Sequence, residues 1–250
     1  MDPTVIKHAA QLLAEARSGE LLDRLPQGQR PTSTAEAYAI QRAITAIVGE
    51  DIAGWKVGEV PGFGFCKGIL LGSRIFASGT NVPAGLMRAP GIEAEIAFRL
   101  DKPLAPRATP YLLEDVAAAV TALPAIEIVD TRFRDYNATP AIERAADFMA
   151  NGGFVGGEPR SDWRRFDLST LNVVLNINGR EVVRRVGGHA AGDPIRPLVD
   201  FANDMRTGDG IPAGAVVTTG TYTGLTPAKA GERVEVVFIG FGAVSIGLDT

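Results

Sequence analysis

The sequence is poor in the residues that build redox and zinc sites, with a single cysteine and two histidines among its 250 residues. A single cysteine, Cys66, excludes an internal disulfide and a cysteine-rich metal cluster. Cys66 also has no histidine near it in the sequence. We therefore interpret it as a buried, inert thiol, with a catalytic nucleophile as the less favoured alternative.

Long apolar runs are absent too, and none approaches the roughly 20 residues that a membrane-spanning helix needs. Charged side chains are scattered through residues 1–20, where a signal peptide would have an uninterrupted apolar segment. The net charge of −4 and the pI near 5.3 provide no basic surface for a phosphate backbone. We therefore expect a cytoplasmic protein that binds neither nucleic acid nor a membrane.

The apolar residues, 46% of the chain, are enough for one large core, and their spacing divides the chain in two. Residues 1–50 have apolar positions three to four apart and predict a helical N-terminal segment, with Thr34 as the N-cap of its second helix. Residues 51–250 predict a β-rich catalytic domain of short apolar runs broken by Gly and Pro. Strands are expected at 54–58, 65–71, 92–100, 124–130, 171–177, 215–219, 233–238 and 243–248, and helices at 113–122 and 197–205. Because strands and helices do not alternate regularly, the order favours an α+β fold.

Two glutamates lie two residues apart inside the apolar run at 91–98. In a strand, residues i and i+2 project from the same face, so Glu93 and Glu95 stand side by side. Ile92, Ala94 and Ile96 would then face a core on the opposite side. Two carboxylates held so close repel each other unless one is protonated or a cation lies between them.

A third glutamate, Glu127, interrupts the apolar run at 124–130 in the same way. Burying a lone carboxylate is unfavourable unless it is paired or bound to a cation. Three carboxylates provide the hard oxygen ligands that Mg²⁺, Mn²⁺ or Ca²⁺ prefers, and no histidine lies nearby in the sequence to suggest zinc. The pattern alone also fits edge strands whose acids face water, which is the more common situation.

Four motifs together resemble those of a known family. They lie at 54–58 (GWKVG), 92–97 (IEAEIA), 123–132 (LPAIEIVDTR) and 213–224 (AGAVVTTGTYTG). Their order is similar to that in 2-keto-4-pentenoate hydratases and 4-oxalocrotonate decarboxylases, a branch of the fumarylacetoacetate hydrolase superfamily. The resemblance covers nearly the whole chain from Ala37 onward. It implies an α+β body of layered mixed sheets that forms a homo-oligomer and acts in the catabolism of aromatic compounds.

The resemblance also implies roles for individual residues. Glu93, Glu95 and Glu127 would bind Mg²⁺ or Mn²⁺, and Lys56 would act as the acid/base group. For work near neutral pH, the pKa of Lys56 would have to be lowered by burial or by the charge of the metal. Without the resemblance, a lysine that passes a sheet edge is an equally good interpretation of Lys56.

Other residues are expected at the substrate. Backbone amides and hydroxyls at 218–221 suit a carboxylate, so we predict that Gly220 and Thr221 bind substrate, although an ordinary strand end is an alternative. We also place Arg132 at the substrate, with Asp130 orienting either Arg132 or a ligand carboxylate. His189 is expected to be a loop residue that could contact substrate.

The expected activity is that of a metal-dependent lyase, a hydratase that converts a 2-hydroxy-2,4-dienoate into a 4-hydroxy-2-oxo acid. The alternatives are a decarboxylase of a 2-oxo-3-enedioate and an acylpyruvate hydrolase. The hydrolase is less favoured because residues 57–92 hold no histidine to activate water. A silent protein that binds 2-oxo acids is a further alternative, because Cys66 and Asp193 stand where related hydratases have Asp and His.

Overall fold

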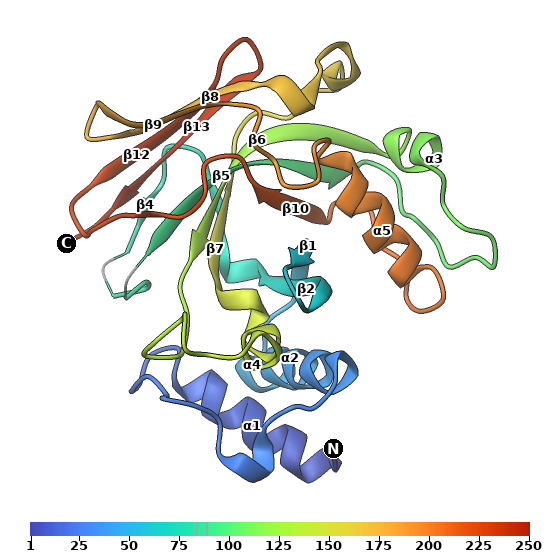
Figure 1. Cartoon of the computed structure of the whole chain (residues 1–250), viewed down its shortest axis with the longest axis vertical. Helices are drawn as coiled ribbons and strands as arrows, with labels where there is room; N and C mark the ends of the chain where they lie inside the picture. The colour runs from blue at the N-terminus through green and yellow to red at the C-terminus, as the bar shows by residue number, and fades with distance from the viewer. Residues whose placement is uncertain (84, 89) are drawn as a thin grey trace.

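The computed structural model describes residues 1–83, 85–88 and 90–250 as two β-sheets with helices around them (Figure 1). The larger sheet has the order β2-β1-β10-β5-β6-β7-β3, with β11 beside β5, and the smaller one has the order β4-β13-β12-β8-β9. The strands are β1 Ile52–Val60, β2 Gly64–Leu71, β3 Ile75–Ala77, β4 Asn81–Val82, β5 Gly91–Leu100, β6 Val120–Val129, β7 Asn151–Gly156, β8 Asn172–Ile177, β9 Arg180–Val186, β10 Val216–Thr221, β11 Thr226–Pro227, β12 Arg233–Phe238 and β13 Gly242–Leu248. The α-helices are α1 Pro3–Glu15, α2 Thr34–Val48, α3 Leu113–Ala117, α4 Ala141–Ala146 and α5 Ile195–Met205. Parallel and antiparallel pairs mix in both sheets, which confirms the α+β prediction.

The N-terminal helices begin at side-chain caps. Asp2 accepts a hydrogen bond from the Thr4 N–H at the start of α1, and Ser33 accepts one from the Glu36 N–H at the start of α2. The prediction of Thr34 as the cap of α2 was wrong by one residue, because Thr34 is already the first residue of the helix. The buried faces of both helices belong to the same apolar core as the sheets.

Most predicted elements are present, and the differences occur where local signals are weak. The helix expected at 113–122 ends at Ala117, because Val120 and Thr121 pair with the end of β5 instead. Such β-branched residues fit a strand better than a helix. β7 was not predicted, since it is short and holds two glycines besides the one at its end. One of these, Gly152, has no room for a side chain: a Cβ there would lie 2.6 Å from Asp130 Cβ.

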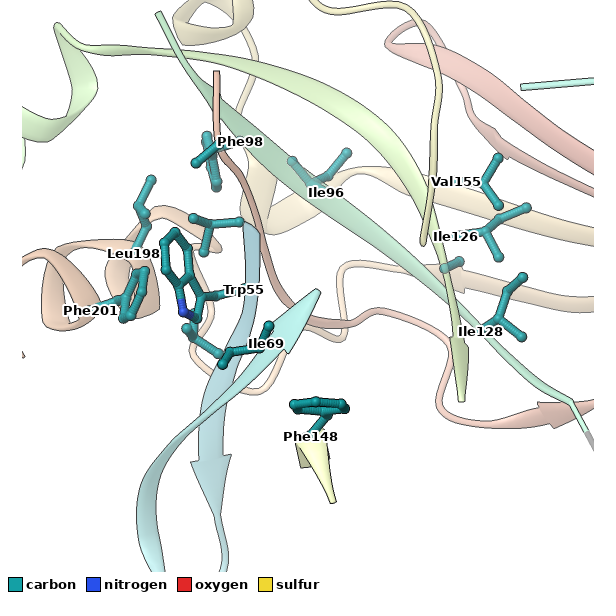
Figure 2. Packing of buried hydrophobic residues seen from close by; sticks show 14 of the residues in the cluster. Trp55, Ile69, Ile96, Phe98, Ile126, Ile128, Phe148, Val155, Leu198 and Phe201 are labelled. Atoms are coloured by element: carbon teal, nitrogen blue, oxygen red, sulfur yellow. The ribbon is translucent and has the colours of Figure 1, made fainter. Parts of the chain in front are cut away.

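The two faces of the large sheet carry different side chains. One face holds large apolar residues, and Figure 2 shows Trp55 of β1 beside Leu198 and Phe201 of α5, with the Trp55 and Phe201 ring centroids 5.3 Å apart. Full burial of such a side chain contributes roughly 1.5–3 kcal/mol. The opposite face holds a smaller cluster formed by Leu70, Ala97, Leu123, Ala125 and Phe154. That face also carries the candidate site. Among the described residues, no helix is both long and apolar enough to cross a membrane.

Candidate active site and metal centre

The strand register places the predicted site residues on one face of the large sheet. Residues paired across neighbouring strands project to the same side, and so do residues two apart along a strand. Lys56 pairs with Thr218 across β1 and β10, and Thr218 pairs with Ala97 across β10 and β5. Glu93 pairs with Glu127 across β5 and β6. Lys56, Glu93, Glu95, Glu127 and Thr218 therefore share this face.

Three carboxylates converge there. One oxygen from each of Glu93, Glu95 and Glu127 lies within 4.8 Å of the other two. Glu95 and Glu127 are each only 1% exposed, and Glu93 is partly buried. The predicted convergence is therefore confirmed, and the alternative of edge strands facing water is wrong because β5 and β6 are internal strands. That the three glutamates bind a metal stays a prediction.

Burial and mutual repulsion favour the protonated forms of Glu93 and Glu95. Loss of solvation, and then the charge of Glu127, raise the pKa of Glu93 to about 7, although Lys56 opposes the shift. Loss of solvation, and then Glu127 and Glu93, raise the pKa of Glu95 to about 8. The cluster therefore favours any added positive charge, whether a proton or a cation.

Lys56 supplies one positive charge to this cluster. Its Nζ forms an ion pair with Glu127 Oε1. Burial lowers the pKa of Lys56, but the charges of Glu127 and Glu93 outweigh that effect and raise the pKa above its usual value. The prediction that burial lowers the pKa of Lys56 was therefore wrong for the metal-free protein. That Lys56 acts as the acid/base group stays a prediction.

Hydrogen bonds fix two of the carboxylates. Glu95 Oε2 accepts from the Thr218 hydroxyl and from the Gly220 N–H, the latter at 3.0 Å. Glu127 Oε1 accepts from Asn151 Nδ2 at 3.0 Å. Gly220 has φ +120°, a conformation that suits glycine, and this conformation turns its N–H toward Glu95. Gly220, which is predicted to bind substrate, thus donates directly to Glu95, a candidate metal ligand.

A cavity of about 300 Å³ opens over these groups. It is lined by the three glutamates, residues 56–60 of β1, Phe65 and Cys66 of β2, residues 189–191, the first part of α5 and the end of β10. Thr221, which is predicted to bind substrate, lies in this lining, and its hydroxyl oxygen accepts from the N–H groups of Thr223 and Gly224. The volume of the cavity is that of a small-molecule site.

Arg132 does not reach the cavity, contrary to the prediction that it binds substrate. Its guanidinium is buried against Asp147, to which it donates from Nε, and it also donates to the main-chain oxygens of Asp130, Asn151 and Asp147 at 2.6, 2.9 and 2.8 Å. The connection to Asp130 runs through that main-chain carbonyl. All of these contacts tie the loop after β6 to the start of β7. Arg132 therefore has a structural position.

His189 and Cys66 line the cavity without forming a catalytic pair. His189 Nε2 lies 2.9 Å from the Thr219 carbonyl, and His189 Nδ1 accepts from the Ala191 N–H at 3.2 Å. The ring is therefore neutral, with its proton on Nε2, and burial lowers its pKa. Cys66 is a buried free thiol, as predicted, and burial raises its pKa to about 11.

Met149 lines the cavity although no pattern in the sequence pointed to it. It lies in a turn where Phe148, Met149 and Ala150 all have positive φ values, of 50°, 55° and 60°. This turn packs against β2 at Gly68, where a Cβ would lie 2.2 Å from the Phe148 carbonyl oxygen. Three consecutive left-handed residues without glycine have no simple sequence pattern.

Residues 69–247 match the family described as the C-terminal region of fumarylacetoacetate (FAA) hydrolase. The chain belongs to this family. It is 32% identical to a 2-hydroxyhexa-2,4-dienoate hydratase of Comamonas testosteroni, over 98% of both chains, and 30% identical to a 4-oxalocrotonate decarboxylase of Pseudomonas putida, over 84% of both. These relatives confirm the prediction of a lyase of the hydratase or decarboxylase type.

A solved relative shares the whole fold of this fumarylacetoacetate hydrolase family member. The 4-oxalocrotonate decarboxylase of Pseudomonas putida G7, complexed with magnesium and adipate, superposes with a TM-score of 0.87 at 25% identity and covers 99% of this chain and 98% of its own. The same enzyme is known in complex with calcium and acetate. The predicted fold of the family is therefore confirmed, and a divalent metal is supported for this group of enzymes.

Proposed function

We propose that the protein is a divalent-metal-dependent hydratase that adds water to a 2-hydroxy-2,4-dienoate and forms a 4-hydroxy-2-oxo acid. The observation that carries this proposal is the convergence of Glu93, Glu95 and Glu127 beside Lys56 in one cavity. The near full-length similarity to a dienoate hydratase supports the same reaction. The substrate is a small 2-oxo or 2-hydroxydienoic acid.

The residues fit a hard divalent cation. Two buried carboxyl groups and a partly buried one face a single ammonium group, so their full ionisation leaves an excess of negative charge that a cation would balance. All the donors are carboxylate oxygens, which suit Mg²⁺ or Mn²⁺ better than zinc. When bound, such a cation supplies a Lewis acid for the C1 carboxylate and the C2 oxygen of a 2-oxo acid.

Lys56 moves the proton. The neighbouring carboxylates raise its pKa and so favour the protonated ammonium form that can donate. Donation to C5, with loss of the 2-hydroxyl proton, converts the dienol into the conjugated 2-oxo-3-enoate. Water then adds across C3 and C4, with its hydroxyl on C4 and a proton on C3. Gly220 and Thr221 lie at the edge of the same cavity and are proposed to orient the substrate carboxylate.

The second candidate is decarboxylation of a 2-oxo-3-enedioate, and the likeness to 4-oxalocrotonate decarboxylases in sequence and structure favours it. The two reactions differ in which bond breaks and in whether water enters. Acylpyruvate hydrolysis is less favoured, because both nitrogens of His189 are bonded to the backbone and neither is free to activate water.

A dienol absorbance assay tests the proposal. Protein treated with a chelator should not consume 2-hydroxypenta-2,4-dienoate, and addition of Mg²⁺ or Mn²⁺ should start the decay. Product analysis for a 4-hydroxy-2-oxo acid or for CO₂ from an enedioate then separates hydratase from decarboxylase. No decay with either substrate and either metal would favour the silent binding protein.

Assembly into a homo-oligomer and a cytoplasmic location stay predictions. Light scattering of the purified protein measures the number of subunits. Metal preference is measured in the same preparation by comparing turnover with Mg²⁺ and with Mn²⁺.

A further inference from the structure

The cavity extends beyond the carboxylates along the hairpin of β1 and β2. Gly58 lies two residues after Lys56, on the same face of β1, and pairs with Cys66 of β2. A Cβ added at Gly58 would meet no atom within 4 Å. The space over Gly58 is therefore open, and it leads from the proton donor to the far end of the hairpin. We call this part of the cavity the distal half. It is defined by Gly58, Val60 and Cys66 on the Lys56 face, by Met149, and by Phe65, which pairs with Glu59 and lines the cavity from the opposite face of the hairpin.

The walls of the distal half are apolar and neutral. Val60, Phe65 and Met149 supply hydrocarbon and thioether surface. Cys66 stays protonated, because burial and then the charge of Glu59 raise its pKa. Met149 is held over this space by the left-handed turn at 148–150, and backbone in that conformation is kept only where the surrounding structure imposes it. The distal half thus offers contact to a carbon chain and no partner to a charge.

The charged side chains at the distal half are negative and would repel a substrate carboxylate. Among the described residues that line the cavity, Lys56 is the only side-chain cation, and it is paired with Glu127. Apart from Glu93, Glu95 and Glu127 of the cluster, the other charged residues of the lining are Glu59 and Asp200, which are both acidic and both exposed. A carboxylate in this half would be desolvated beside like charges.

Neighbouring cations outside the lining are already engaged. Lys67 on β2 forms an ion pair with Asp204. Arg144 stacks over the Tyr136 ring, with 4.6 Å from Cζ to the centroid, and donates to the Tyr136 carbonyl at 3.2 Å. Neither side chain lines the cavity.

We infer that the distal half selects substrates that have one carboxylate and an uncharged alkyl extension beyond C5, and that it rejects substrates with a second carboxylate at that end. This inference rests on the proposed function, since the carboxylate cluster must hold the 2-oxo acid end. Gly58 leaves room for the extension, Met149 and Phe65 contact it, and Glu59 and Asp200 repel an anionic terminus. The same arrangement favours the hydratase over a decarboxylase of enedioates.

Two stable ligands of equal chain length test the selection. 2-Oxohexanoate ends in a methyl group and 2-oxohexanedioate ends in a carboxylate, while their first carbons are identical. Titration calorimetry with the Mn²⁺-loaded protein should give a Kd for the monoacid that is at least about tenfold lower. The double variant Glu59→Gln, Asp200→Asn should reduce that preference at least about threefold. Glu158→Gln, an exposed acid outside the cavity, is the matched control and should leave the preference unchanged.

A second variant tests the path of the extension. Gly58→Val would place two methyl groups in the open space. It should raise the Kd of 2-oxohexanoate at least about tenfold. The Kd of pyruvate, which has no extension, should stay near its original value. Equal or tighter binding of the diacid by the original protein, or equal weakening of pyruvate and 2-oxohexanoate by Gly58→Val, would overturn the inference. If pyruvate and both longer acids fail to bind the metal-loaded protein, the proposed function falls as well.

Discussion

Lys56 Nζ and Glu127 Oε1 form an ion pair although the two residues lie 71 positions apart in the chain. Two strands, β10 and β5, separate β1 from β6 in the large sheet, yet all four strands present the relevant side chains on one face. The same oxygen, Glu127 Oε1, also accepts a hydrogen bond from Asn151, so two side chains hold it in place. The cluster is therefore a fixed arrangement in which lysine balances one of three negative charges.

Replacement of Lys56 separates proton transfer from metal binding. Lys56→Met removes the donor and should lower kcat about 10²- to 10⁴-fold, the usual contribution of a positioned acid or base. The affinity for Mn²⁺ should stay the same or increase, because a cation that competes for Glu127 is gone. Stopped-flow turnover and calorimetry with Mn²⁺ measure the two effects. Lys67→Met on the neighbouring strand, outside the cavity lining, is the control, and unchanged turnover in Lys56→Met would reject the proposed role.

Replacement of Glu95 should remove metal binding and increase the stability of the metal-free protein. In Glu95→Gln the new amide would keep an oxygen for the Thr218 and Gly220 donors, while the substitution removes one of three repelling buried charges. Above pH 8, where Glu95 is ionised, this variant is therefore expected to raise the Tm of the metal-free protein by about 2 °C or more, the shift that about 1 kcal/mol produces in a domain of this size. Addition of Mn²⁺ should raise the Tm of the original protein and not that of the variant. A variant that Mn²⁺ still stabilises fully would show that Glu95 is not a ligand.

The raised pKa values of Glu93 and Glu95 set the pH dependence of stability. Both carboxyls have an ordinary pKa of 4.5, and the folded protein raises these to about 7 and about 8. Between those limits the folded state binds more protons than the unfolded state, so the free energy of unfolding falls as pH rises. Thermal melts with a chelator should show Tm decreasing from about pH 5 to pH 8. Mn²⁺ should reverse the trend, because ligation favours the deprotonated carboxylates. A chelated protein whose Tm is flat over this range would contradict the assignment.

The carboxylate cluster could be predicted because strand alternation is a local rule. Glu93 and Glu95 interrupt an apolar run, and their spacing alone puts Ile92, Ala94 and Ile96 on the opposite, buried face, as the structure shows. Glu127 interrupts a second apolar run in the same way, and the resemblance to a known family then supplied Lys56 as a neighbour. What the sequence could not show is which strands lie side by side, since β10 comes between β1 and β5 only through long-range pairing.

The segment between β6 and β7 could not be predicted for a different reason. Arg132, Asp147 and the turn at 148–150 depend on one another through buried hydrogen bonds that no local pattern encodes. An arginine that follows a strand of candidate ligands is as typical of substrate binding as of structural pairing. The position of Met149 follows from left-handed backbone that residues other than glycine rarely adopt.

The close packing at Gly68 provides a test of this segment. Gly68→Ala would force a Cβ to within 2.2 Å of the Phe148 carbonyl oxygen and 3.1 Å of Lys56 Cγ. We expect a loss of about 1–3 kcal/mol in the free energy of unfolding, typical of overpacking. Gly58→Ala is the matched variant on the paired strand, where a Cβ meets open space, and its stability should change by less than about 0.5 kcal/mol. Denaturant unfolding of both proteins measures the difference, and equal losses would show that the turn at 148–150 adjusts freely.

Replacement of Arg132 tests whether this residue has a structural role or binds substrate. The guanidinium makes its bonds to Asp147 and to three carbonyl oxygens while buried, and a lysine at this position cannot reproduce that set. Arg132→Lys should therefore lower the free energy of unfolding by about 2–4 kcal/mol, toward the loss seen when a buried ion pair is broken. Because Arg132 does not line the cavity, the KM of the folded fraction should stay within about twofold of the original at a temperature well below the new Tm. A large rise in KM without a loss of stability would instead place Arg132 at the substrate.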